Sequence, residues 1–281
     1  MAKRLELLSF GGGVQSTAII VLIEQGKLPK PDAILWSDTG EESEDVYAHI
    51  EALTPRLNAI APFHVTRKGG KRPRLGMAVI DKALTSKGVN TLPYFLKNPN
   101  GGPPQLVRRG CTFNYKTNPL HILARRLVKS AGGKSTKEDP GYRFWLGISR
   151  DEMQRMKADS WHPLIEEFDG RLRSDAVSRL ECQAIMTNAG QTAPRSSCVF
   201  CPFRTKHEWS ILSEKDRARV MEIDAALEAG FNMHGKHGAL EDRPYLRPDL
   251  RAASEPGWFD GAPDDQMVFG WDNECAGICG V

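Results

Sequence analysis

The chain begins with two apolar runs that are separated by three glycines. Residues 4–10, RLELLSF, have the apolar, extended character of a buried strand. Residues 16–26, STAIIVLIEQG, have helical spacing, and the final glycine, Gly26, is placed to end a helix. The glycines at 11–13 therefore occupy a turn between a strand and a helix, at the positively polarised helix N-terminus.

The same alternation continues along the chain. Residues 32–37, DAILWS, predict a strand that runs into Asp38, Thr39 and Gly40, and an acidic helical segment follows. Residues 143–146, RFWL, predict another strand, followed by a helix after residue 150. Because strand and helix patterns alternate from residue 4 to about 165, we predict the α/β class: a doubly wound parallel sheet with helices on both faces.

Beyond about residue 165 the pattern becomes helical. Residues 174–190 and 212–230 predict two helices, and from residue 231 the chain is rich in glycine, proline and charge and is expected to be irregular. His234 and His237 are expected to be surface histidines. We therefore divide the chain into two domains, residues 1–165 and residues 166–281.

Composition and charge narrow the class of protein. The 281 residues are 40% hydrophobic and carry a net charge of +3, which is typical of a soluble protein with a sizeable core. We see neither a transmembrane run nor a signal peptide, and we expect a cytoplasmic protein. In that compartment the six cysteines favour metal ligands or reactive thiols over disulfides.

The glycine turn has the properties of a phosphate cradle. Glycine allows the backbone to approach an anion closely, and Ser16 and Thr17 add hydroxyl donors. The alternative is a tight turn without a ligand. The spacing matches neither a Walker A loop nor a Rossmann dinucleotide fingerprint.

What residues 11–16, GGGVQS, do resemble is the PP-loop, S-G-G-x-D-S, of the ATP pyrophosphatase superfamily. Gly11 stands where that motif has serine, and Gln15 where it has aspartate. Asp38–Gly40 resembles a D-T-G motif of the phosphoadenosine-phosphosulfate (PAPS) reductase branch. Residues 147–155 resemble an element of that family that contacts phosphate or sulfate. The first domain is thus similar to the adenine nucleotide alpha hydrolase (HUP) fold.

This resemblance implies a set of binding residues for ATP or a sulfonucleotide, with magnesium as a further cofactor. The loop set is Ser9, Gly11, Gly12, Gly13, Gln15, Ser16 and Thr17. Asp38, Thr39 and Gly40 are implied to border the adenosine pocket. Gly147, Arg150 and Arg155 are implied to contact the anion, with Arg150 in a catalytic role, because the guanidinium group offers a planar fork of donors.

The cysteine spacing indicates a metal centre. Cys198 and Cys201 form a C-x-x-C motif beside a proline, a spacing that lets two thiolates reach one metal or one cluster. The alternative is two unrelated loop cysteines. Cys182 lies in a helical pattern and is expected to be a packed core thiol.

Cys111, in GCTFNYKTNPL, resembles the C-C…K…P-L segment of sulfonucleotide reductases that carry a [4Fe-4S] cluster, with Gly110 in place of the first cysteine. Cys111, Cys198 and Cys201 therefore carry over as three cluster ligands. Either a fourth ligand comes from Cys275 or Cys279, or one iron stays open, as in the cluster-dependent tRNA thiolases of this superfamily.

The tail, ECAGICG, resembles the mobile E-C-G-I/L-H segment of cluster-type reductases. That resemblance makes Cys275 a candidate nucleophile, with Cys279 as a second candidate catalytic thiol. Alternatively, Cys275 and Cys279 could join Cys198 and Cys201 in a structural four-thiolate zinc site.

Basic residues gather near these segments. Residues 67–74, RKGGKRPR, carry five positive charges, and residues 97–104 form a second loop that leads toward Arg108 and Arg109. Arg125 and Arg126 add charge close to Cys111 in sequence. Such charge suits RNA, DNA or the phosphates of a sulfonucleotide. The alternative is a solubilising surface.

Three functions remain open. The first is an iron-sulfur-dependent sulfurtransferase that uses ATP to activate a nucleobase in RNA or DNA and takes sulfur from a donor. The second is a sulfonucleotide reductase that works with a thioredoxin-type reductant. The third is a zinc-stapled, non-catalytic nucleotide-binding protein. We prefer the first, because the second tail cysteine and the basic loops have no role in the reductase, and we leave the oligomeric state open, with a homodimer as one candidate.

Overall fold

The computed structural model describes residues 4–68, 75, 94–106, 110–234 and 243–261. At its centre is a four-stranded, fully parallel sheet with the strand order β3-β2-β1-β6. The strands are β1 (Leu5–Ser9), β2 (Ala33–Ser37), β3 (Phe63–Thr66) and β6 (Tyr142–Leu146). Ser9 pairs with Leu35 on one side and with Leu146 on the other, so the carboxyl ends of these strands meet at one edge.

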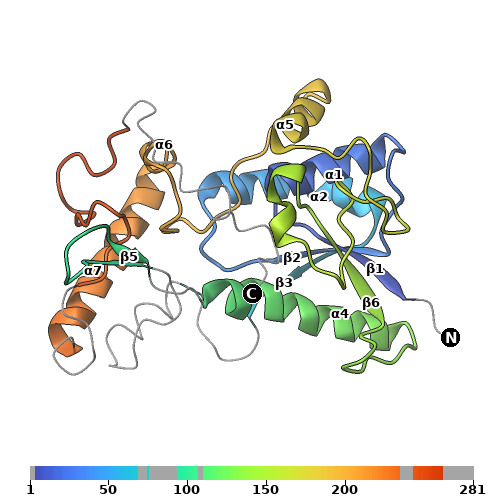
Figure 1. The fold of residues 1–281 in the computed structure, drawn as a ribbon, viewed down its shortest axis with the longest axis horizontal. Helices are drawn as coiled ribbons and strands as arrows, with labels where there is room; N and C mark the ends of the chain where they lie inside the picture. The colour runs from blue at the N-terminus through green and yellow to red at the C-terminus, as the bar shows by residue number, and fades with distance from the viewer. Residues whose placement is uncertain (1–3, 69–74, 76–93, 107–109, 235–242, 262–281) are drawn as a thin grey trace.

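Helices cover both faces of the sheet. α1 (Val14–Glu24), α2 (Glu44–Ile60) and α5 (Arg179–Asn188) lie on one face, and α4 (Asn118–Ser130) lies on the other (Figure 1). The predicted α/β class, with a parallel sheet between two helical layers, is confirmed.

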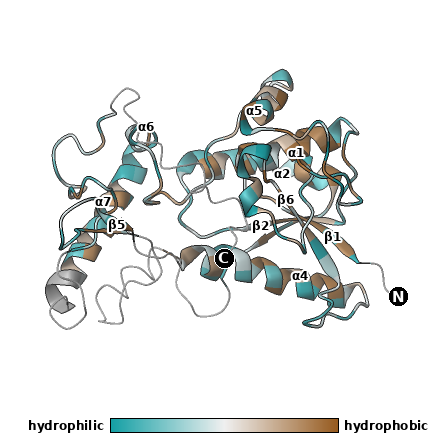
Figure 2. Ribbon diagram, viewed as in Figure 1, coloured by the Kyte–Doolittle hydropathy of each residue, from teal (hydrophilic) through white to brown (hydrophobic). Residues whose placement is uncertain are grey.

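Burial on both faces explains the composition of these elements. All five residues of β2 are buried, and α1 buries nearly its whole length, as its sequence VQSTAIIVLIE suggests. α4 packs one face on the sheet, and Figure 2 shows both hydrophobic and hydrophilic residues along this helix. Cys182 and Met186 of α5 are part of this core, which confirms the prediction of a packed Cys182 thiol.

The ends of the helices follow the sequence signals. Gly26, which follows the C-cap residue Gln25 of α1, adopts a φ of 71°, and the amide of Lys27 donates to the carbonyl of Leu22, so Gly26 ends the helix as predicted. α5 begins with a capping box between Ser178 and Glu181.

A second hydrophobic cluster lies at the other end of the molecule (Figure 1). Its residues come mainly from α6 (Lys206–Ser210), α7 (Glu214–His234) and residues 243–261, together with Tyr115, Val199 and Phe200. A hairpin of β4 (Phe95–Leu96) and β5 (Gln105–Leu106) joins this end of the molecule through the backbone bonds between Phe95 and Tyr245. Trp209 and Trp258 pack edge to face with ring centroids 5.0 Å apart.

The two clusters do not divide the chain at one position. The core around the sheet includes Cys182, and the second cluster includes Tyr115. The domain boundary at residue 165 stays a prediction. Each of β4 and β5 has only two residues, which is too short for a periodic sequence signal.

The helix predicted after residue 150 is short and of the 3-10 kind, Arg150–Arg155, and it is interrupted at Glu152, which has a φ of −125°. α7 continues four residues beyond the predicted helix, and residues 243–261 form turns without a regular helix, as predicted. His237 lies outside the described residues.

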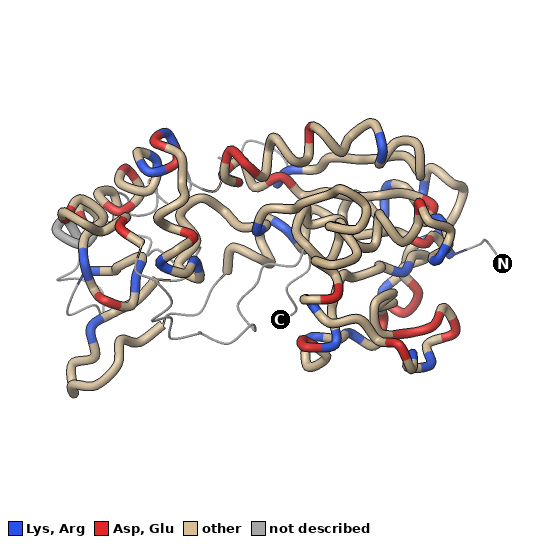
Figure 3. Tube along the Cα trace, turned by 90° about the horizontal axis from the view of Figure 1, so that it is seen from above, with Lys and Arg blue, Asp and Glu red and all other residues tan. Residues whose placement is uncertain are grey.

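Within the described ranges, every helix is too short or too polar to cross a bilayer. Charges of both signs alternate along the described chain (Figure 3). Arg125 and Arg126 are exposed on α4, whereas Arg108 and Arg109 lie outside the described residues.

Candidate functional site

The glycine turn lies at the carboxyl end of β1 and leads directly into α1. Gly13 is the N-cap of α1, no side chain caps the helix there, and its first turn contains no acidic residue. The N-terminal amides of α1 are therefore not engaged by a capping side chain, which is the arrangement of an anion-binding helix terminus.

The glycines are required by the backbone and by close neighbours. Gly12 has a φ of 74°, in the region that favours glycine. A Cβ on Gly13 would lie 3.2 Å from the Cβ of Ser196, and one on Gly147 would lie 3.1 Å from the backbone nitrogen of Ser16. Gly147 therefore lets the chain after β6 pack directly on the start of α1.

The predicted hydroxyl donors of the loop have partners within the protein. Ser16 Oγ donates to the carbonyl of Gly13 at 3.1 Å, and Thr17 Oγ1 lies 3.2 Å from Nε2 of His49. Ser9 Oγ is buried and has no hydrogen-bond partner among the described residues.

Asp38 lies at the end of β2, next to the glycine turn, and its carboxylate is fully engaged. Its Oδ1 accepts from the amide of Gly40 at 2.7 Å and from the hydroxyl of Tyr47 at 2.9 Å, and Oδ2 accepts from Arg67 at 2.5 Å. Burial, together with the charge of Asp38, raises the pKa of Tyr47. Asp38 thus fixes the turn after β2.

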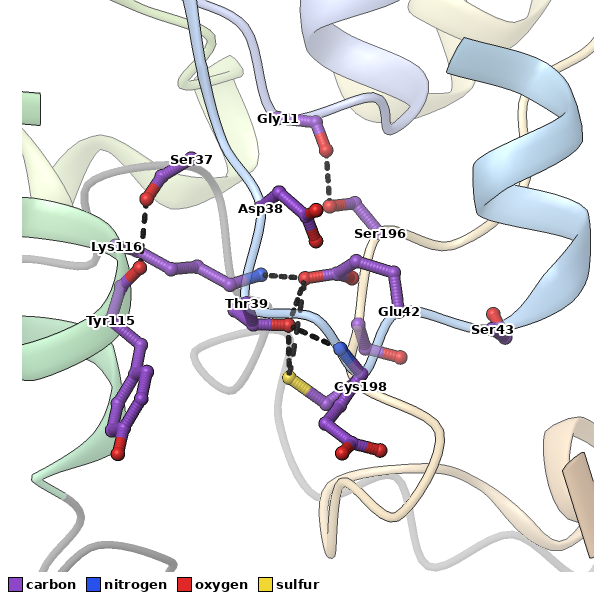
Figure 4. A network of polar contacts seen from close by, with 12 residues as sticks. Gly11, Ser37, Asp38, Thr39, Glu42, Ser43, Tyr115, Lys116, Ser196 and Cys198 are labelled. Carbon is purple, nitrogen blue, oxygen red and sulfur yellow. Dashed lines mark hydrogen bonds and ion pairs between the residues drawn. The ribbon is translucent and has the colours of Figure 1, made fainter. Parts of the chain in front are cut away.

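Thr39 connects this turn to the cysteine motif. Its Oγ1 donates to Oε1 of Glu42 at 3.1 Å and lies 3.5 Å from Sγ of Cys198 (Figure 4). Glu42 and Cys198 also form an isolated antiparallel bridge. The thiol of Cys198 is thus held at the same edge of the sheet as the predicted nucleotide-binding residues.

The segment before Cys198 contacts the glycine turn itself. Ser196 Oγ donates a short hydrogen bond to the carbonyl of Gly11 (Figure 4). Arg204 fixes the other side of the motif, since its Nη2 donates to Oγ of Ser43 at 3.2 Å and its Nε donates to the carbonyl of Cys198 at 3.3 Å. One short segment therefore joins the candidate phosphate cradle to the C-x-x-C motif.

A buried ion pair lies beside the thiol. Lys116 Nζ is 3.1 Å from Oε1 of Glu42, and their side chains are only 7% and 1% exposed. Lys116 belongs to a π-helix, Thr112–Thr117, which follows Cys111 and is tied to the sheet by Ser37 Oγ, a donor to the carbonyl of Tyr115. Sequence analysis did not assign Lys116 or Glu42 to the site. Lys116 stands in the segment GCTFNYKTNPL that was quoted for Cys111, but its pairing with Glu42 is visible only in the fold.

These surroundings set the state of the Cys198 thiol. Burial is the main cause that raises the pKa of Cys198 well above its ordinary value, and the carboxylate of Glu42 adds to it. Lys116 and the Thr39 hydroxyl act in the opposite direction. Without a bound metal, these surroundings therefore favour the thiol of Cys198 over the thiolate.

The metal ligands predicted from the sequence are brought together only in part. Cys111 and Cys198 pack against the same hydrophobic cluster, and Cys201 lies close enough to Cys198 to act on its charge. No three His, Cys, Asp or Glu side chains of the described ranges are grouped as a metal site, and none of the four described cysteines is in a disulfide. Cys275 and Cys279 lie outside those ranges.

The predicted anion-binding arginines are each paired with a carboxylate of the protein. Arg155 Nη1 donates to Oε1 of Glu152 at 2.5 Å. Arg150 is 54% exposed and lies 3.5 Å from Glu181. Of the basic loop 67–74, Arg67 and Lys68 are described; Lys68 Nζ lies 4.1 Å from the ring centroid of Tyr115.

Gln15 is held between two charged side chains that sequence analysis did not single out. Its Nε2 donates to Oε2 of Glu152 at 3.2 Å, and its Oε1 accepts from Arg179 at 3.3 Å. Glu152 and Arg179 are 137 and 164 residues away from Gln15 in sequence, so no local sequence pattern predicts these two contacts.

Comparison with known proteins leaves the chain without an assigned family, because no protein-family model matches it and no curated protein matches it.

Proposed function

We propose that the carboxyl edge of the sheet binds an adenine nucleotide, with its phosphate groups against the N-terminal amides of α1. Three observations support this: the uncapped start of α1, the glycine turn with Gly12 in the left-handed region, and the position at the carboxyl ends of parallel strands. This is the arrangement expected for the PP-loop domain of a PAPS reductase-like protein.

We further propose that the protein is a sulfurtransferase that uses ATP to activate a nucleobase of RNA or DNA. The observation that carries this proposal is the segment from Ser196 to Cys198. It bonds to the glycine turn at Gly11 and places a thiol 3.5 Å from the hydroxyl of Thr39. A thiol and a nucleotide site that share one edge can act on the same substrate.

The chemistry divides into an activation and a transfer. ATP transfers its AMP group to an oxygen of the nucleobase and releases pyrophosphate. A persulfide on one cysteine of the C-x-x-C motif, loaded by a sulfur donor, attacks the activated carbon, and AMP leaves with the oxygen. The other cysteine attacks the sulfur that remains on the protein. The base keeps one sulfur, Cys198 and Cys201 become a disulfide, and a thiol reductant resets the pair.

A [4Fe-4S] cluster or a zinc ion is a separate proposal. The described residues do not by themselves complete either site, so no step above depends on a metal. Measuring iron, acid-labile sulfide and zinc after anaerobic purification tests it on the wild type and on Cys111→Ala. Iron and sulfide that are lost in the variant support the cluster. Zinc that is bound by the wild type and retained in Cys111→Ala supports a structural zinc site that does not use Cys111.

Sulfonucleotide reduction is the second candidate. It is favoured by Gln15, because an amide stands where the PP-loop motif has the carboxylate associated with ATP cleavage. In that reaction a cysteine of the tail attacks the sulfur of the sulfonucleotide, the adenine nucleotide leaves, and a thioredoxin-type dithiol releases sulfite. The candidate nucleophile, Cys275, lies outside the described residues.

One assay separates the two candidates. The full chain is incubated either with ATP, a sulfur donor and RNA or DNA, or with adenosine phosphosulfate and thioredoxin. Thiolated nucleosides with equimolar AMP support sulfur transfer, and sulfite supports reduction. Cys198→Ala should abolish thiolation, whereas Cys182→Ala, a cysteine in the core, should retain it. Thiolation that survives in Cys198→Ala would exclude the proposed role of the motif.

A further inference from the structure

A chain of polar side chains, buried at its centre, crosses the start of α1. It runs from Arg155 through Glu152 and Gln15 to Arg179, with donor–acceptor distances of 2.5, 3.2 and 3.3 Å. Gln15 is 5% exposed and Glu152 is 2% exposed. Gly147 makes this contact possible, because its missing Cβ lets the segment that carries Glu152 approach the backbone of Gln15.

The carboxylates at this part of the edge are already used by the protein. Each oxygen of Glu152 accepts a hydrogen bond, Oε2 from Gln15 and Oε1 from Arg155. Both oxygens of Asp38 are engaged as well, by Gly40, Tyr47 and Arg67.

Magnesium does not fit this set of side chains. Proteins usually hold Mg²⁺ through one or two carboxylates together with the phosphates of the substrate. Here Gln15 offers an amide, and the nearest carboxylate, Glu152, is committed to an arginine. Two further buried acids follow Asp38: Glu41 is paired with Arg219, and Glu42 is paired with Lys116 through Oε1.

We infer that the site binds the phosphate groups of its nucleotide without a bridging divalent cation. The compensating positive charge comes from the α1 terminus and from the guanidinium group of Arg179, which donates to the amide oxygen of Gln15, whereas the guanidinium group of Arg155 is paired with Glu152. Gln15 is then the residue that determines this specificity. The inference rests on the proposed nucleotide site and adds the form in which the nucleotide binds. The inference concerns how the nucleotide binds. A magnesium ion that arrives with ATP would be held by the phosphate groups and not by side chains of the protein.

The test is a titration of the full chain with ADP by calorimetry, once in excess magnesium chloride and once in excess EDTA. The two dissociation constants should agree within about twofold. A loss of tenfold or more in EDTA, about 1.4 kcal/mol, would overturn the inference and leave the nucleotide site standing. Absence of binding in both buffers would overturn the proposed site and the inference together.

Two variants at one position sharpen the result. Gln15→Asp should weaken ADP binding in EDTA by at least tenfold, and magnesium should restore much of the loss, because the new carboxylate repels phosphate unless a cation lies between them. Gln15→Asn, the matched control, should bind equally in both buffers. Equal magnesium dependence in both variants would contradict the role of Gln15. Arg179→Met, which leaves Gln15 unchanged, should weaken ADP binding by the same factor in both buffers. Weaker binding in the magnesium buffer alone would also contradict the inference.

Discussion

Lys116→Met should destabilise the protein far more than an ordinary surface substitution. The lysine is the charged partner of Glu42, at 3.1 Å, in a site where both side chains are almost completely buried. Its removal leaves a buried carboxylate whose second oxygen, Oε2, already has no hydrogen-bond partner among the described residues. Methionine has a similar length, so the loss is mainly one of charge.

The magnitude follows from the geometry. At 3.1 Å and an effective dielectric constant of about 20, the attraction between the two charges is about 5 kcal/mol. Desolvation offsets much of it in the intact pair, but removal of one partner from a buried pair costs about 3–5 kcal/mol. Lys116→Met combined with Glu42→Gln should recover most of this loss, because no uncompensated charge remains.

The free energy of unfolding is measured by urea denaturation of the wild type, both single variants and the double variant. We expect a coupling energy of about 2–3 kcal/mol between the two positions. Arg171→Met is the control: the side chains of its ion pair with Asp169 are 81% and 52% exposed, so its loss should leave the free energy of unfolding almost unchanged. A loss below about 1 kcal/mol for Lys116→Met, or strict additivity in the double variant, would refute this reasoning.

Three further predictions concern the core and the glycine turn. Gly147→Ala should cost about 1–3 kcal/mol of stability and should weaken ADP binding, because the new Cβ would lie only 3.1 Å from Ser16 and 3.3 Å from Gln15. Urea denaturation measures the first effect and calorimetry the second. An unchanged ADP affinity would contradict the role assigned to Gly147. Burial lowers the pKa of the His49 imidazole below its ordinary value of 6.5. The unfolded chain therefore binds a proton at His49 more readily than the folded chain, and the folded state loses stability as the pH falls through and below 6.5. His49→Gln should lose less stability than the wild type between about pH 7.5 and 5.5, and an equal loss would exclude His49 as a source. Burial raises the pKa of Cys182 to about 12, so iodoacetamide should leave Cys182 unmodified in the native protein at neutral pH. Peptide mass spectrometry measures the labelling. Rapid labelling would show that reagent reaches Cys182 and that this part of the core is not closed.

Local signals in the sequence predicted the parts of the fold that depend on neighbouring residues. The strand, glycine turn and helix at residues 5–24 follow from apolar spacing, and Gly26 ends the helix where a left-handed residue is needed. The 3-10 helix after residue 150 was not predictable in this way. Inside it, Glu152 departs from helical geometry and accepts a hydrogen bond from Gln15, far away in sequence.

The candidate site shows the same division. The strand ends that bear Asp38 and Gly147 were predicted, because parallel strands bring their carboxyl ends to one edge. The pairing of Lys116 with Glu42, and the bond from Ser196 to Gly11, depend on how distant segments pack. Spacing along the chain carries no information about such contacts.

The central claim is that an adenine nucleotide binds at the glycine turn, beside the Cys198 thiol. Hydrogen exchange of the full chain with and without ADP, followed by mass spectrometry, tests it most directly. The account predicts slower exchange in peptides that cover residues 11–17, 38–40 and 147–150, and unchanged exchange in the core of α7. Protection confined to other segments, or no protection at saturating ADP, would contradict it.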